Sequence, residues 1–111
     1  MVVSTKWLTG VYDMGTSLKH AQFLTDSRVA DAALGDADAC YELGMVYSSG
    51  AAGVGVDLIE AHKWFNLAAV AGSEIAKDCR RDIAEDMTAR EIAAAQAAAR
   101  AVLVSRQRRA A

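Results

Sequence analysis

Residues 35–72 read GDADACYELGMVYSSGAAGVGVDLIEAHKWFNLAAVAG, and this stretch decides the fold. Glycines stand at both ends and in the middle, while apolar residues recur at three- and four-residue spacing on either side of the central glycines. Such spacing is typical of amphipathic helices, and the glycines mark the turns between them. Asp36 and Asp57 stand where helix N-caps are expected. The stretch therefore predicts a hairpin of two helices, at about 36–49 and 58–71.

Small residues inside the two predicted helices indicate that their backbones approach closely. Gly44 lies in the first helix, and Ala61 and Ala68 lie on the apolar face of the second. At such positions the helix axes can come together while aromatic rings fill the flanking gaps. Glu60 follows Asp57 by three residues, as the second member of a capping box does.

Two further helices are expected after the hairpin. Ser73 can cap a helix that runs to about Glu85. Thr88 and Glu91 have the spacing of a capping box and open a long alanine-rich helix that runs to about Ser105. An apolar seam along this last helix indicates packing on one neighbour; its members are Ile92, Ala95, Ala99, Val102 and Leu103.

The segment before the hairpin predicts helices at about 16–24 and 26–34. The residues expected to face inward there are Met14, Leu18, Ala21, Leu24, Val29 and Ala33. We therefore expect an all-α fold of about five to six helices forming one compact domain. Its parts are an N-terminal helical cap (1–34), the hairpin (35–72) and C-terminal capping helices with a basic tail (73–111).

Composition bounds the class of protein. The chain has 111 residues, of which 53% are hydrophobic and 23% charged, and it contains no proline. It is too apolar for disorder and too short for a separate substrate domain. Cys40 and Cys79 are too few for a disulfide scaffold, so we expect both thiols to be reduced. Met1 to Gly15 make a poor signal peptide and no apolar run could span a bilayer, which favours a cytoplasmic protein.

Charge is unevenly distributed along the chain. The formal net charge is −2, yet residues 1–76 carry 4 basic and 9 acidic side chains while residues 77–111 carry 8 and 5. Cations near a helix C-terminus complement the helix dipole, which is the simplest interpretation. The alternative is contact with nucleic-acid phosphates. The residues that would make this contact are Arg100, Arg106, Arg108 and Arg109.

The hairpin resembles one Sel1-like repeat, a relative of the tetratricopeptide repeat. The matching positions, in order, are Gly35-Asp36-Ala37-Asp38-Ala39, Leu43-Gly44-Met45-Val46-Tyr47, Gly50, Gly53-Val54, Asp57, Ala61, Trp64, Ala68-Ala69 and Gly72. Thirteen residues separate Tyr47 from Ala61, whereas tetratricopeptide repeats use about eight, and the longer connection is similar to that of Sel1-like repeats. Residues 87–100 are similar to the closing helix of short, single-repeat bacterial members. The chain departs from the family pattern between Gly50 and Gly53, where it has two residues, Ala51 and Ala52, and the family usually has one.

No catalytic constellation, metal site or cofactor site is predicted. The run from Gly50 to Gly55 lacks the order of a phosphate-binding loop and no Lys-Ser/Thr follows it, so we expect a structural turn whose glycines adopt positive φ. His20 and His62 belong to no ligand spacing, and the carboxylates are accounted for by helix ends and exposed faces. We expect a chain that is not an enzyme.

The resemblance implies a protein–protein contact module, because Sel1-like repeats generally mediate such contacts. One repeat cannot bury its own apolar face, so flanking helices, a second copy or another protein must cover it. We expect the hairpin face to dock a partner helix or peptide, or a second copy in a homodimer. The candidate contact residues are Tyr41, Tyr47, His62, Trp64 and Asn66. Their rings are also expected in the hairpin core, with Tyr41, His62 and Trp64 the ones that look outward.

Overall fold

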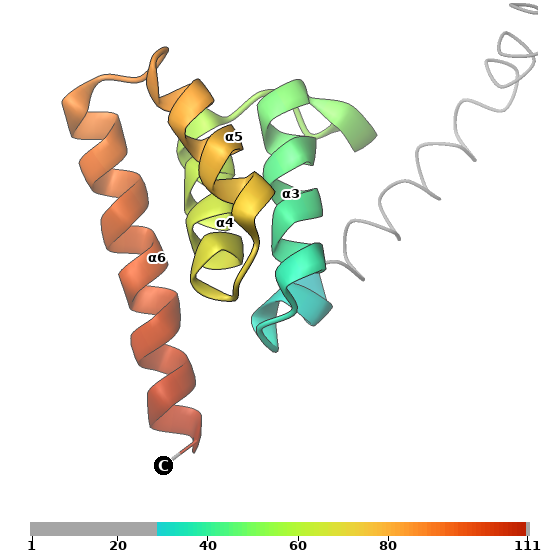
Figure 1. Cartoon of the computed structure of the whole chain (residues 1–111), viewed down its shortest axis with the longest axis vertical. Coiled ribbons are helices and arrows are strands. Elements are labelled where there is room, and N and C mark those ends of the chain that lie inside the picture. The colour runs from blue at the N-terminus through green and yellow to red at the C-terminus, as the bar shows by residue number, and fades with distance from the viewer. Residues whose placement is uncertain (1–28, 111) are drawn as a thin grey trace, which may run out of the picture.

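Every regular element of the chain that the structure describes, residues 29–110 of a computed structural model, is helical (Figure 1). Residues 29–33 are helical and lead into α3 (Ala37–Ser49), a 3₁₀ turn η1 (Ala51–Gly53), α4 (Leu58–Val70), α5 (Glu74–Ala84) and α6 (Ala89–Ala110). The predicted all-α fold of about five to six helices is confirmed. No helix within residues 29–110 combines the length and apolar character needed to cross a bilayer.

The helices α3 and α4 form the predicted hairpin. Asp36 caps α3 by accepting a hydrogen bond from the Ala39 amide at 3.0 Å, and Gly50 ends it in the left-handed conformation with φ of 78°. The two helices pack tightly at Gly44, where a Cβ atom would overlap the ring of Phe65. Any side chain at this position would push the helices apart, so glycine is required by packing and not by backbone conformation.

The connection between α3 and α4 is a structural turn, as predicted. Gly50, Gly53 and Gly55 all have positive φ. The amide of Asp57 donates to the carbonyl of Tyr47 at 2.8 Å and closes the loop across the hairpin. Asp57 caps α4 through the Glu60 amide at 3.1 Å, but the reciprocal half of the predicted capping box is absent because the Asp57 amide is already used.

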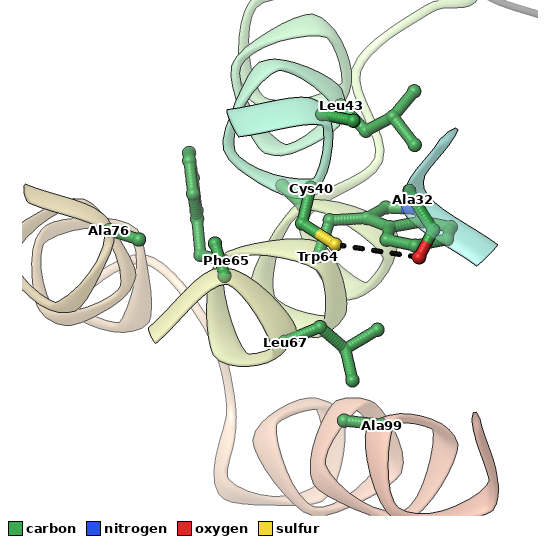
Figure 2. Close-up of a cluster of buried hydrophobic side chains, with 11 residues drawn as sticks. Ala32, Cys40, Leu43, Trp64, Phe65, Leu67, Ala76 and Ala99 are labelled. Atoms are coloured by element: carbon green, nitrogen blue, oxygen red, sulfur yellow. Dashed lines mark hydrogen bonds between the residues drawn. The ribbon is translucent and has the colours of Figure 1, made fainter. Parts of the chain in front are cut away.

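The central helix of the fold is α4, which contacts α3, α5 and α6 directly. Figure 2 shows its side chains leaving in different directions: Trp64 lies beside Ala32, and Leu67 points toward Ala99 of α6. Phe65 packs under Gly44. The buried core is Ala32, Ala39, Cys40, Leu43, Ala61, Trp64, Phe65, Leu67, Ala68, Ala76 and Ala99. The flanking helices α5 and α6 therefore cover the faces of α4 that α3 leaves open.

Caps fix the starts of the last two helices. Ser73 accepts from the Ala76 amide at 3.2 Å, as predicted for α5. Thr88 and Glu91 form both halves of the predicted capping box, at 2.8 and 3.1 Å. The helix α6 runs to Ala110, about one turn beyond the expected end near Ser105. Arginine and glutamine are good helix formers, so the basic tail extends the helix.

The residues before the hairpin correct one expectation. The predicted helix at 16–24 and its inward-facing residues lie outside the described residues. Of the predicted helix at 26–34, residues 29–34 are described; residues 29–33 are helical and Leu34 lies in a turn. Within that part Ala32 is the fully buried residue, whereas Val29 is exposed and Ala33 half-buried. The prediction that Val29 faces inward is therefore wrong, because this helical turn packs through Ala32.

Candidate functional site

An apolar groove lies between α6 and residues 29–33, with Trp64 of α4 on its floor. A hollow of about 330 Å³ is lined by Val29, Ala33, Trp64, Ala101, Val102, Ser105 and Arg109. A second hollow of about 380 Å³ shares Ala33 and Arg109 with the first and adds Leu34 and Arg106. We refer to the two together as the α6 groove. Its rim carries apolar side chains in solvent, with Val29 39% and Leu34 86% exposed.

The α6 groove exists because small side chains stand between its two helical walls. On α6, Ala101, Ser105 and Arg109 are four residues apart and so share one face of the helix. Ala33 contributes only a methyl group from the opposite wall, and Ala101 does the same from α6. Larger side chains at these two positions would fill the space between the walls, as they do in a closed core, whereas two methyl groups leave it open.

Arg106 joins the two walls. Its guanidinium donates a hydrogen bond to the carbonyl of Ala32 at 2.5 Å, across 74 residues of sequence. The Cys40 thiol donates to the same carbonyl at 3.9 Å (Figure 2). Burial raises the pKa of this thiol, and the neighbouring Arg106 only partly offsets the effect. Cys40 is therefore a protonated packing residue, and Arg106 is an anchor that holds residues 29–35 against α6.

Trp64 presents part of its ring to the α6 groove, while its indole N–H makes a hydrogen bond within α4. The indole Nε1 donates to Glu60 at 3.2 Å, and Lys63 Nζ lies 4.4 Å from the centre of the ring. Glu60 also pairs with Lys63 at 3.0 Å. Only 7% of Trp64 is exposed. The predicted outward orientation is therefore wrong, because residues 29–33 cover one side of the ring, and what remains accessible is the patch that floors the groove.

The two tyrosines among the predicted contact residues are half-buried in the hairpin. The ring of Tyr41 lies 5.9 Å from that of Phe65, centre to centre. Burial, and then the nearby charges of Glu60 and Asp57, raises the pKa of Tyr47. Both rings pack against the core, so they serve the hairpin more than an outer surface.

His62 and Asn66 point toward α5 and not toward solvent. Arg80 of α5 donates to Asn66 Oδ1 at 2.5 Å. His62 is 3% exposed, and its Nδ1 has no hydrogen-bond partner in the described chain. Burial, and then the charge of Arg80, lowers the pKa of His62 from 6.5. The expectation that His62 looks outward is wrong, because α5 packs over it.

The structure thus does not bring the five predicted contact residues together on one face. Only Trp64 lines the α6 groove. Sequence reasoning missed Ala33, Ala101 and Ser105 as groove residues and placed Arg109 in another role. Val102, which belongs to the predicted apolar seam of the last helix, was a signal in the sequence for one wall of the groove. No local pattern indicates that residues 29–33 form the opposite wall.

The four arginines of the alternative interpretation do not form one patch. At about 100° per residue, Arg100 and Arg109 lie on opposite sides of α6, about 180° apart. Arg106 is partly buried and bonded to Ala32. Arg108 is exposed on a third side.

Chemistry beyond packing is sparse in the described part of the chain. Among residues 29–110, no three His, Cys, Asp or Glu side chains gather in a group that could hold a metal ion. Comparison with protein-family models, with curated proteins and with solved structures finds no match to this chain. The α6 groove is therefore the feature of residues 29–110 that bears most directly on function.

Proposed function

We propose that this chain is a non-enzymatic protein–protein interaction module that docks a helix or peptide of a partner protein in the α6 groove. The observation that carries the proposal is an open apolar groove, floored by Trp64 of the helical hairpin and walled by α6 and residues 29–33. The resemblance of residues 35–72 to a Sel1-like repeat supports the same class of function. The docking surface differs from the hairpin face that the sequence alone favoured.

The size and chemistry of the α6 groove suit side-chain anchors. Its first hollow, about 330 Å³, has the volume of a small ligand pocket and is open along one side. A partner could place one or two apolar side chains there, against a tryptophan that is already held in position by Glu60. Buried aromatic anchors of this kind dominate the energy of many interfaces.

The arrangement of the C-terminal arginines separates this proposal from the nucleic-acid alternative. Contact with nucleic acid through the C-terminal arginines is less favoured, because one of them is anchored to Ala32 and the others are spread around α6. A homodimer would place a second copy of the chain in the same groove. Light scattering measures the molar mass in solution and so tells a monomer from a dimer. The free thiols of Cys40 and Cys79 agree with a cytoplasmic setting, which forms part of the proposal.

The test compares two charge insertions on α6. Ala101→Glu places a carboxylate in the α6 groove, whereas Ala93→Glu places one about two turns away on another face of the same helix, and both positions are exposed. The immobilised wild type and both variants are used to capture proteins from a cell extract, with quantitative mass spectrometry as readout. We expect bound proteins that are retained by Ala93→Glu and lost from Ala101→Glu. If the two variants capture the same proteins as the wild type, the groove is not the docking site.

A further inference from the structure

We infer that the occupant of the α6 groove is an acidic amphipathic helix of a partner protein, with apolar side chains seated on Trp64 and a carboxylate directed at Arg109. This inference rests on the proposed function and adds the chemistry of the partner. It is carried by the charge of the residues that line the groove and by the shape of its walls.

The α6 groove has a mainly apolar lining, and the charged side chains in that lining are all basic. Its lining includes two arginines, Arg106 and Arg109, and no acidic side chain. Arg106 is occupied, since its guanidinium donates to the Ala32 carbonyl. Arg109 is exposed and makes no ion pair within residues 29–110. A carboxylate of the partner would therefore complement Arg109, and a lysine or arginine there would be repelled.

The walls of the α6 groove favour a helix. One wall is α6 and the other is the helical turn at 29–33, so a third helix can pack between them as amphipathic helices do in other apolar grooves. The run from Ala101 to Arg109 along α6 spans about 12 Å at 1.5 Å per residue. This distance corresponds to about two turns. The partner helix would carry apolar residues at i and i+3 or i+4, and an Asp or Glu one to two turns away.

The competing occupants fit less well. Nucleic acid would be drawn to phosphate-facing arginines gathered on one surface, whereas Arg100 and Arg109 face opposite sides of α6. A basic or uncharged peptide would meet the same apolar floor but would leave Arg109 without a counter-ion. These occupants are outcomes of the experiment below.

The experiment selects binders from a library of random 16-residue peptides displayed on phage, with the immobilised full chain as target. We expect the enriched peptides to combine Leu, Phe or Met at helical spacing with an Asp or Glu. Synthetic copies are then titrated by fluorescence anisotropy against the wild type, Arg109→Glu and the matched control Arg100→Glu. Both arginines are exposed, so neither change should disturb folding, and circular dichroism checks this.

The expected result is binding weakened about tenfold by Arg109→Glu and unchanged by Arg100→Glu, with binding to Arg109→Glu restored when the acidic residue of the peptide is changed to Lys. Equal weakening by both variants would show non-specific attraction and would overturn the inference. So would enrichment of basic or uncharged peptides.

A third variant separates this inference from the proposed function. Peptides that lose binding to Ala101→Glu but are indifferent to Arg109→Glu would overturn the acidic-helix inference and leave docking in the α6 groove intact. A selection in which no enriched peptide depends on Ala101 would count against both.

Discussion

Replacing Gly44 with alanine tests the tight packing of the two hairpin helices. The Cβ atom of an alanine here would overlap two ring carbons of Phe65 and lie 2.9 Å from its Cγ. Phe65 is 1% exposed and among the largest fully buried side chains, so its ring has little room to move. Gly44→Ala must therefore separate α3 from α4 or shift the ring.

The magnitude follows from two opposing effects. Adding a methyl group to a closed core costs about 1–3 kcal/mol, and a direct overlap with a buried ring places Gly44→Ala near the upper end. Alanine favours the helix over glycine by about 1 kcal/mol, which offsets part of that cost. We expect a net loss of about 2 kcal/mol in the free energy of unfolding. For a domain of this size, the loss lowers the midpoint of thermal unfolding by about 10 °C.

Urea denaturation followed by circular dichroism measures the loss, and a double-mutant cycle with Phe65→Leu assigns its cause. Leucine has no atom at the Cε1 position, and its two methyl groups can adopt another rotamer, so it relieves most of the overlap that the planar ring of Phe65 enforces. In that background the same change should cost little or even stabilise the helix, giving a coupling free energy of about 2 kcal/mol. If Gly44→Ala is as stable as the wild type, or costs the same in both backgrounds, the packing argument is wrong.

Three further predictions concern other contacts. Arg106→Ala leaves the carbonyl of Ala32 without its charged donor and should cost about 2 kcal/mol in urea denaturation, whereas Arg108→Ala, an exposed residue on the same helix, should cost less than about 0.5 kcal/mol. Because burial lowers the pKa of His62 in the folded state, the unfolded chain binds the extra proton first as pH falls below 6.5. The free energy of unfolding of the wild type should thus be highest above pH 6.5 and should fall as the pH approaches the folded-state pKa of His62. The fall should be shallower in His62→Gln. Parallel plots of unfolding free energy against pH for the two proteins would contradict this. Thr88→Ala removes the N-cap of α6 and should cost about 1 kcal/mol, with the loss of helical signal on heating moved to lower temperature.

Local sequence determined where the helices begin. Asp36, Asp57, Ser73 and Thr88 each cap the helix that their positions predicted. The turn at Gly50 likewise follows from its positive φ, which glycine adopts without steric cost. These features depend on residues within three or four positions of one another, so the sequence carries them without knowledge of the fold. The close approach at the hairpin was also predictable, from small residues at helical spacing.

Tertiary packing decided the orientation of the rings and the position of the candidate site. The sequence allowed Trp64 and His62 to face either the core or solvent, and the outcome depended on residues 29–33 and on α5 packing over them. The α6 groove joins Ala33 to Arg109, and the anchor that shapes it joins residues 74 positions apart. No local periodicity specifies such pairs, because they are selected by how several helices share one core. Short-range hydrogen bonding therefore set the helices, and the burial of apolar surface between distant segments set the groove.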